Sequence, residues 1–258
     1  MNEEPVRIAM WSGPRNISTA MMRAFENRPD TGVIDEPFYG VYLKSTGINH
    51  PLRDEVLAAC PTDWRKIVRA MLGPSPGGRR VFYQKHMTHH MLPEIGRDWI
   101  AQCRNAFLIR APEAVLASYS VKRREVMLAD IGFVEQRELF DRESDRLGRA
   151  PVVIDADEVL ADPRGTLTAL CARLGIPFSE RMLHWPAGRR ASDGVWAPVW
   201  YDAVERSTGF APPTASPPEP LPAHLQTIAD AARPHYDRLA KFKLTRIDAF
   251  AAVPPTRI

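Results

Sequence analysis

The chain has 258 residues, of which 45% are hydrophobic, and its formal net charge is +3. This length and composition suffice for one substantial core, so we expect a single domain over residues 1–258. The small charge, without a basic block, argues against nucleic acid as a partner. No apolar run reaches the length of a membrane span, and the acidic start is unlike a signal peptide, which together predict a cytoplasmic protein. The oligomeric state stays open.

The first predicted elements are a strand, a tight turn and a helix. Residues 7–12 form a short apolar run, Gly13-Pro14 marks the turn, and apolar residues then recur at helical spacing. The first turn of a helix has unpaired backbone N–H groups and a partial positive charge, so this connection suits an anion. Ser18 and Thr19 add hydroxyl donors, and Arg15 adds a charged fork. The Gly-Lys-Ser/Thr pattern of nucleotide triphosphatases is missing.

Further apolar runs predict four more strands, at residues 31–35, 80–85, 105–110 and 152–155. Helical patterns separate them, at residues 52–60, 62–72, 112–122, 134–148, 165–174 and 223–240. Strands that alternate with helices predict an α/β fold of three layers, α/β/α, with a five-stranded parallel sheet covered on both faces. Residues 211–222 form a Pro-rich connector, and we expect residues 251–258 to be a poorly ordered tail.

Polar residues follow the second and third strands, where ligands bind in open parallel sheets. Glu36 follows the second strand and can act as a general base, an anchor for an arginine or a helix cap. The third strand ends in Lys85-His86, with His89 and His90 close behind. An imidazole titrates near neutral pH and can accept a hydroxyl proton, although these histidines can also cap a helix that starts near His89. Without a nearby carboxylate or cysteine at ligand spacing, they predict no metal site.

Two later segments add basic residues. Arg110 ends the fourth strand, and Ser118 lies eight residues further on, within the following helix. Residues 185–210 contain glycines, large aromatic residues and the pair Arg189-Arg190, without clear periodicity. That composition predicts a loop that closes over a ligand.

The first connection resembles the Pro-Lys/Arg-Ser-Gly-Ser/Thr-Thr loop of sulfotransferases that use PAPS (3′-phosphoadenosine 5′-phosphosulfate). In that family the loop holds the 5′-phosphosulfate end of PAPS. The resemblance assigns donor binding to Pro14, Arg15, Asn16, Ile17, Ser18 and Thr19, with Ile17 in place of the usual glycine. The spacing of Arg110 and Ser118 resembles the family's second signature, which holds the 3′-phosphate. Arg189-Arg190 stands where the family has an Arg-Lys-Gly loop that contacts the 3′-phosphate and the adenine.

The resemblance also implies a P-loop fold like that of bacterial sulfotransferases, and a reaction. The reaction would be metal-independent, in-line transfer of a sulfuryl group from PAPS to a hydroxyl or amine of a small-molecule or carbohydrate acceptor, with adenosine 3′,5′-bisphosphate as product. Arg15 falls on the family's catalytic Lys or Arg, and His86 on a strand-end His that takes the acceptor proton. Some bacterial carbohydrate sulfotransferases use a Glu from the region of Glu36. We favour His86 as the base.

Two alternatives remain at this point. The first is a P-loop kinase or phosphohydrolase, which usually needs a loop lysine that this chain lacks and a magnesium-binding acid. The second is a catalytically silent nucleotide-binding protein of the same fold.

Overall fold

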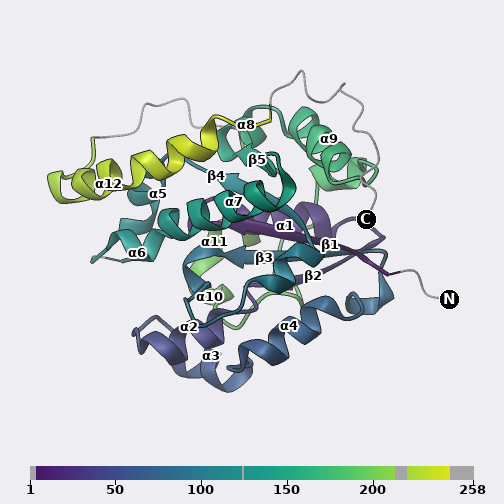
Figure 1. The fold of residues 1–258 in the computed structure, drawn as a ribbon, viewed down its shortest axis with the longest axis horizontal. Helices are drawn as coiled ribbons and strands as arrows, with labels where there is room; N and C mark the ends of the chain where they lie inside the picture. The colour runs from purple at the N-terminus through teal and green to yellow at the C-terminus, as the bar shows by residue number, and fades with distance from the viewer. Residues whose placement is uncertain (1–3, 124, 213–219, 245–258) are drawn as a thin grey trace.

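The computed structural model describes residues 4–123, 125–212 and 220–244. Its centre is a five-stranded parallel sheet with the strand order β2-β3-β1-β4-β5 (Figure 1). The strands are β1 (Val6–Ser12), β2 (Thr31–Asp35), β3 (Val81–Met87), β4 (Arg104–Ile109) and β5 (Val152–Asp155). The predicted α/β fold with a five-stranded parallel sheet is therefore confirmed.

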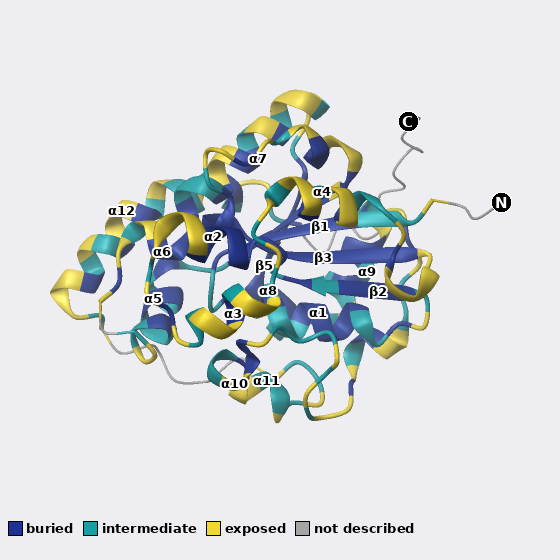
Figure 2. Cartoon of the chain, turned by 90° about the horizontal axis from the view of Figure 1, so that it is seen from below, coloured by how far each residue is buried: buried dark blue, intermediate teal, exposed yellow. Residues whose placement is uncertain are grey.

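Helices cover both faces of this sheet because its strands are apolar on both sides. Along β1, Ile8 and Met10 are buried in one apolar cluster, and Ala9 and Trp11 are buried in another on the opposite face. The first face is covered by α1 (Ser18–Glu26), α8 (Ala156–Ala161) and α9 (Pro163–Arg173). The second face is covered by α4 (Trp64–Leu72), α7 (Phe133–Leu147) and α12 (Ala223–Ala240). Figure 2 shows the buried strands between α4 and α7 on one side and α1 on the other.

Shorter elements surround the carboxyl ends of the strands and the edges of the sheet. The remaining α-helices are α2 (Tyr39–Thr46), α3 (Arg53–Ala59), α5 (Pro112–Ser120), α6 (Leu128–Ile131), α10 (Ala197–Trp200) and α11 (Asp202–Glu205). The 3-10 helices are η1 (Pro76–Gly78), η2 (Thr88–His90), η3 (Asp98–Gln102) and η4 (Glu180–Leu183). The helix predicted near His89 is thus a single 3-10 turn, and the segment 185–210 contains two short helices.

Two predicted features fall partly or wholly outside the described residues. Residues 213–219 of the Pro-rich connector and the tail 251–258 belong to the parts of the chain that the structure does not describe. Among the helices that are described, none combines the length and apolar character that a membrane span requires.

The strand order places a crevice at the carboxyl ends of the central strands. β1 lies between β3 and β4, although β2 and β3 both precede β4 in the chain. The connection after β1 therefore leaves the sheet centre in one direction and the connection after β3 crosses back over it. Ligands of open α/β sheets bind where the direction of the connections reverses in this way.

Candidate active site

A cavity of about 400 Å³ lies beyond the carboxyl ends of β1, β2, β3 and β4. The loop after β1 contributes residues 14–17, and α1 contributes its first turn. Glu36 follows β2, Lys85 stands near the end of β3, and Arg110 follows β4. The cavity thus brings together most of the site residues that the sequence predicted, from elements far apart in the chain.

The loop between β1 and α1 has an unusual backbone. Arg15 has φ 55° and Ile17 has φ 44°, so two residues with side chains adopt the left-handed conformation. Each such residue costs on the order of 1 kcal/mol and persists only where the surrounding structure holds it, often at functional sites. A side chain at Gly13 would meet the carbonyl oxygen of Ile131 at 2.6 Å, which explains the glycine there. The loop delivers the N-terminus of α1, residues 18–20, to the cavity wall as an anion-binding end.

Arg15, Arg110 and Ser118 contact one another at this end of the cavity. The Nε of Arg15 donates to Ser118 Oγ at 2.9 Å, and Nη1 of Arg110 donates to the Arg15 carbonyl oxygen at 2.8 Å. Asn16 anchors the loop by donating from Nδ2 to the Leu108 carbonyl oxygen at 2.6 Å. Within the described residues neither guanidinium has an ion-pair partner, and Arg110 Nε is buried without a hydrogen bond. Burial and the neighbouring charge of Arg110 lower the pKa of Arg15.

Two adjacent cations without a directly paired counterion are costly in a protein, and here the charge of Asp202 opposes the effect of Arg110 on the pKa of Arg15 only in part. An anionic ligand removes that cost. The geometry at this end of the cavity is therefore suited to a ligand that has at least one phosphate or sulfate group, held by guanidinium, hydroxyl and backbone N–H donors.

Glu36 is the only carboxylate among the described residues that line the cavity. Its side chain is 12% exposed and accepts from Lys85 Nζ at 2.6 Å, while the same Nζ donates to Asp35 Oδ1 at 2.8 Å. Burial raises the pKa of Glu36, the charge of Lys85 opposes this shift, and the charge of Asp35 adds to it. Burial alone would lower the pKa of Lys85, but Asp35 and Glu36 raise it well above its usual value. Glu36 can therefore accept a proton in the cavity, beside a cation that stays charged.

His86 does not reach the cavity, contrary to the interpretation that favours it as the base. Successive side chains of a strand point to opposite faces, so His86 and Lys85 cannot both face the same cavity. The His86 ring stacks on Trp11 with a centroid distance of 4.4 Å, on the face that α4 and α7 cover. It is 1% exposed, and burial lowers its pKa to about 3. Of the two adjacent residues at the end of β3, the alternation of side chains brings Lys85, and not His86, to the cavity.

Other histidines line the cavity instead. The 3-10 turn η2 brings His89 and His90 to its wall, and His50 joins them from the connection between α2 and α3. Tyr39 stacks on the His90 ring at 4.8 Å, and its hydroxyl lies 2.8 Å from His50 Nδ1. Burial lowers the pKa of His50 to about 4, that of His89 to about 3 and that of His90 well below its usual value. His50 belongs to no motif, and sequence reasoning missed it.

No metal centre is found in the parts of the chain that the structure describes, where no group of three or more His, Cys, Asp or Glu residues could hold an ion.

Arg189 and Arg190 do not join the other predicted donor-binding residues. Arg190 donates from Nη2 to the Pro186 carbonyl oxygen at 2.7 Å, and Arg189 Nε lies 3.7 Å from Glu205 Oε1. The Arg189 side chain is 57% exposed, and neither arginine lines the cavity. From the same segment, which the sequence predicted to close over a ligand, Trp196 and Tyr201 do line the cavity.

Comparisons with known proteins agree with this geometry. A family model described as "Sulfotransferase domain" matches residues 6–242. The chain is 37% identical over 236 residues to "Branched-chain-amino-acid aminotransferase-like protein 1" of Arabidopsis thaliana. That match covers 92% of this chain but 42% of the relative, so the chain spans less than half of the relative's length.

Two solved structures share the fold at low sequence identity. The sulfotransferase domain of the Synechococcus PCC 7002 olefin synthase has a TM-score of 0.53 and 17% identity, over 90% of this chain and 96% of that domain. A sulfotransferase from Alicyclobacillus acidocaldarius has a TM-score of 0.50 and 16% identity, over 95% of this chain and 99% of that protein.

Proposed function

This chain belongs to the sulfotransferase domain family, and from that premise we propose that it transfers a sulfuryl group from PAPS to an acceptor hydroxyl or amine. The observation that carries the proposal is the convergence of Arg15, Arg110 and Ser118 beside the first turn of α1. PAPS has anionic groups at both its 5′ and 3′ positions. A cavity with two guanidiniums that lack ion-pair partners in the described chain fits a donor of this kind.

The donor-binding roles are divided between the two motifs. The loop residues Arg15, Ser18 and Thr19 would hold the 5′-phosphosulfate, and Arg110 with Ser118 would hold the 3′-phosphate. Within the described residues, Ser118 Oγ accepts from Arg15 Nε and Arg110 Nε has no partner, so donor binding would replace contacts among these side chains. Because Arg189 and Arg190 are directed elsewhere, they are left out of this assignment.

Arg15 and Glu36 would carry the chemistry. As the bond from sulfur to the acceptor oxygen forms and the bond from sulfur to the 5′-phosphate oxygen breaks, the electron pair of the broken bond stays with the phosphate. Arg15 stabilises the negative charge that develops there. Glu36 takes the proton of the acceptor hydroxyl, and Lys85 keeps the Glu36 carboxylate in place. The pKa of Glu36, raised by burial, makes it a better base than an exposed carboxylate.

Calorimetry tests the donor assignment directly. Adenosine 3′,5′-bisphosphate should bind far more tightly than AMP, because only the bisphosphate carries the 3′-phosphate that Arg110 and Ser118 would hold. Equal affinities would remove the basis for naming PAPS as the donor. Retention of sulfuryl transfer from PAPS in the presence of a chelator would separate this reaction from that of a magnesium-dependent kinase.

A further inference from the structure

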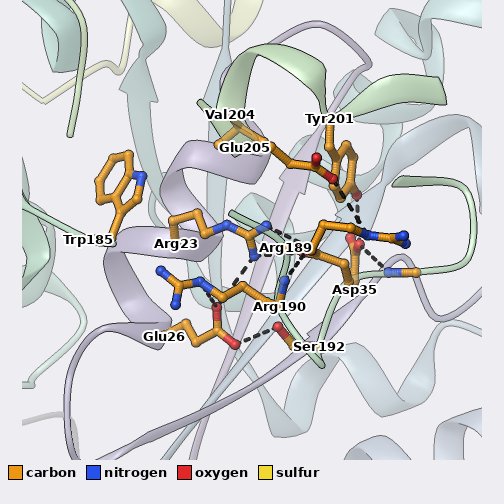
Figure 3. A network of polar contacts seen from close by, with 12 residues as sticks. Arg23, Glu26, Asp35, Trp185, Arg189, Arg190, Ser192, Tyr201, Val204 and Glu205 are labelled. Atoms are coloured by element: carbon orange, nitrogen blue, oxygen red, sulfur yellow. Dashed lines mark hydrogen bonds and ion pairs between the residues drawn. The ribbon is translucent and has the colours of Figure 1, made fainter. Parts of the chain in front are cut away.

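The segment Arg190–Trp196 connects two parts of the site through buried ionic contacts (Figure 3). Asp193 and Arg23 are each 1% exposed in their side chains, and their atoms Oδ1 and Nη1 lie 2.6 Å apart. A second contact joins Asp193 Oδ2 to Arg23 Nη2 at 2.7 Å. Arg23 belongs to α1, whose first turn forms part of the donor end of the cavity. The segment is thereby held against the same helix that begins at the phosphate loop.

The segment is also tied to the carboxyl end of β2. The backbone N–H of Gly194 donates to Asp35 Oδ2 at 3.2 Å, and the hydroxyl of Tyr201 donates to the same oxygen at 2.6 Å. That hydroxyl in turn accepts from Lys85 Nζ at 2.7 Å and from Trp196 Nε1 at 3.0 Å. One O–H donor and two lone pairs are the full capacity of a tyrosine hydroxyl, so every bond of this group is used.

These contacts fix two cavity-lining rings beside Glu36. Trp196 meets Tyr39 edge to face, with a centroid distance of 5.0 Å and an interplanar angle of 85°. A methyl group at Gly194 would lie 2.2 Å from the Trp196 ring, so only glycine permits the observed indole position. Asp35 and Asp193 do not line the cavity themselves. They act on it through Trp196 and Tyr201.

The acceptor end that these rings enclose offers no charge to a second substrate. The charged residues among the described cavity lining are Arg15, Arg110, Lys85 and Glu36, and the first two belong to the donor end. Lys85 has three N–H donors, and Asp35, Glu36 and Tyr201 accept one each. Glu36 is paired with that lysine, and the proposed reaction needs it as the base.

The imidazoles of the wall are neutral as well, because burial keeps them from protonating. Two charges nearby, Arg123 and Asp130, shift the pKa of His50 in opposite directions and partly cancel. A charged group brought into such surroundings loses its hydration without gaining a partner, which weakens its binding. Flat rings, by contrast, find aromatic faces to pack against.

We propose that the acceptor is an uncharged, ring-bearing alcohol, and that Asp35 and Asp193 are positioning residues that hold the Trp196–Tyr201 wall against it. This inference rests on the proposed function. In this chain the segment Arg190–Trp196 serves the acceptor and takes no part in holding the donor, since Arg190 and the preceding Arg189 are bonded within the protein and do not line the cavity.

Three naphthols with the same acceptor hydroxyl test the substrate class. 2-Naphthol is uncharged, 6-hydroxy-2-naphthoate adds a carboxylate, and 6-(aminomethyl)-2-naphthol adds an ammonium group. We expect kcat/KM for 2-naphthol to exceed that for each charged analogue by at least about tenfold. A charged analogue that is sulfated as well as 2-naphthol, or a protein that binds adenosine 3′,5′-bisphosphate but sulfates none of the three, would overturn the inference. Failure to bind the bisphosphate would instead contradict the donor assignment.

Two variants test the positioning role separately. Asp193→Asn removes the charge that holds the segment to Arg23, and Gly194→Ala displaces the Trp196 ring. Each should raise KM for 2-naphthol about tenfold, while kcat and the Kd of adenosine 3′,5′-bisphosphate change by less than about twofold. Arg28→Met is the matched control, because Arg28 is a buried arginine of another ion pair, 2.9 Å from Asp30, outside the cavity lining. It should leave all three quantities unchanged.

Amide hydrogen exchange of the wild-type protein gives a readout that does not depend on turnover. Added adenosine 3′,5′-bisphosphate should protect residues 13–20 and leave residues 189–195 unaffected. Protection of residues 189–195 would show that the segment binds the donor and would overturn the inference. An increase of about tenfold in the Kd of the bisphosphate in Asp193→Asn or in Arg189→Ala would overturn it as well.

Discussion

Replacement of Arg110 by methionine should separate ligand binding from stability. Among the residues that the structure describes, the Arg110 side chain makes one hydrogen bond, from Nη1 to the Arg15 carbonyl oxygen at 2.8 Å, and its Nε is buried without a partner. Loss of that bond costs about 1 kcal/mol, and relief of the repulsion between Arg110 and Arg15 offsets it. We therefore expect Arg110→Met to change Tm by less than about 4 °C.

The same substitution should impair binding of the 3′-phosphate. A hydrogen bond to a charged group contributes about 1.5 to 3 kcal/mol, which corresponds to a loss of about tenfold to a hundredfold in affinity for adenosine 3′,5′-bisphosphate. AMP lacks the 3′-phosphate, so its affinity should change by less than about threefold. Isothermal titration calorimetry with both nucleotides measures these values, and a thermal melt without ligand measures stability.

Arg104→Met is a suitable control for this experiment. Arg104 lies at the opposite end of β4 and also donates to a backbone carbonyl group, that of Leu174, outside the cavity lining. Its replacement should leave both nucleotide affinities unchanged. The reasoning would be refuted if Arg110→Met bound the bisphosphate within about threefold of the wild type, or if it lost AMP and bisphosphate affinity to the same extent.

Other substitutions test the remaining roles. Arg15→Ala should lower kcat by a hundredfold or more with a smaller loss of donor affinity, measured by steady-state kinetics, because its contact strengthens as the leaving group becomes charged. Glu36→Gln should lower kcat by at least about a hundredfold, and the wild-type rate should fall as pH drops through the raised pKa of Glu36. His86→Leu should keep kcat within about threefold. The pKa of His86 is about 3 in the folded protein and near 6.5 in the unfolded chain, so the unfolded chain binds the proton first as pH falls below 6.5. The wild-type protein therefore loses up to about 1.4 kcal/mol of stability per pH unit from this residue. Thermal melts should show that His86→Leu loses less stability than the wild type over the same pH range.

The fold could be predicted from the sequence because local patterns specify its elements. The five strands are short apolar runs separated by amphipathic helices and by turns rich in glycine and proline, and these signals depend on neighbours in the chain. The loop from Gly13 to Thr19 and the spacing from Arg110 to Ser118 are also local. Parallel strands place their carboxyl ends at one edge, so the meeting of Arg15 with Ser118 follows from the topology.

Which side chain of a strand faces the cavity depended on the tertiary structure. Lys85 and His86 are adjacent in the sequence. Because the strand is apolar on both faces, its sequence does not indicate whether the odd-numbered or the even-numbered side chains face α1. Tertiary packing determines the orientation of both side chains. Trp11 stacks on His86 on the side of α4 and α7, while Asp35 and Glu36 form ion pairs with Lys85.

Long-range contacts decided where the segment after residue 185 lies. Its arginines suggested a donor contact, since a basic pair in a glycine-rich loop suits a phosphate. The structure instead pairs Asp193 with Arg23, 170 residues earlier in the chain, and joins Gly194 to Asp35. Which groups form an ion pair depends on their distance in the folded state and on the free-energy cost of leaving either group buried without a partner. Neither quantity can be read from the local sequence.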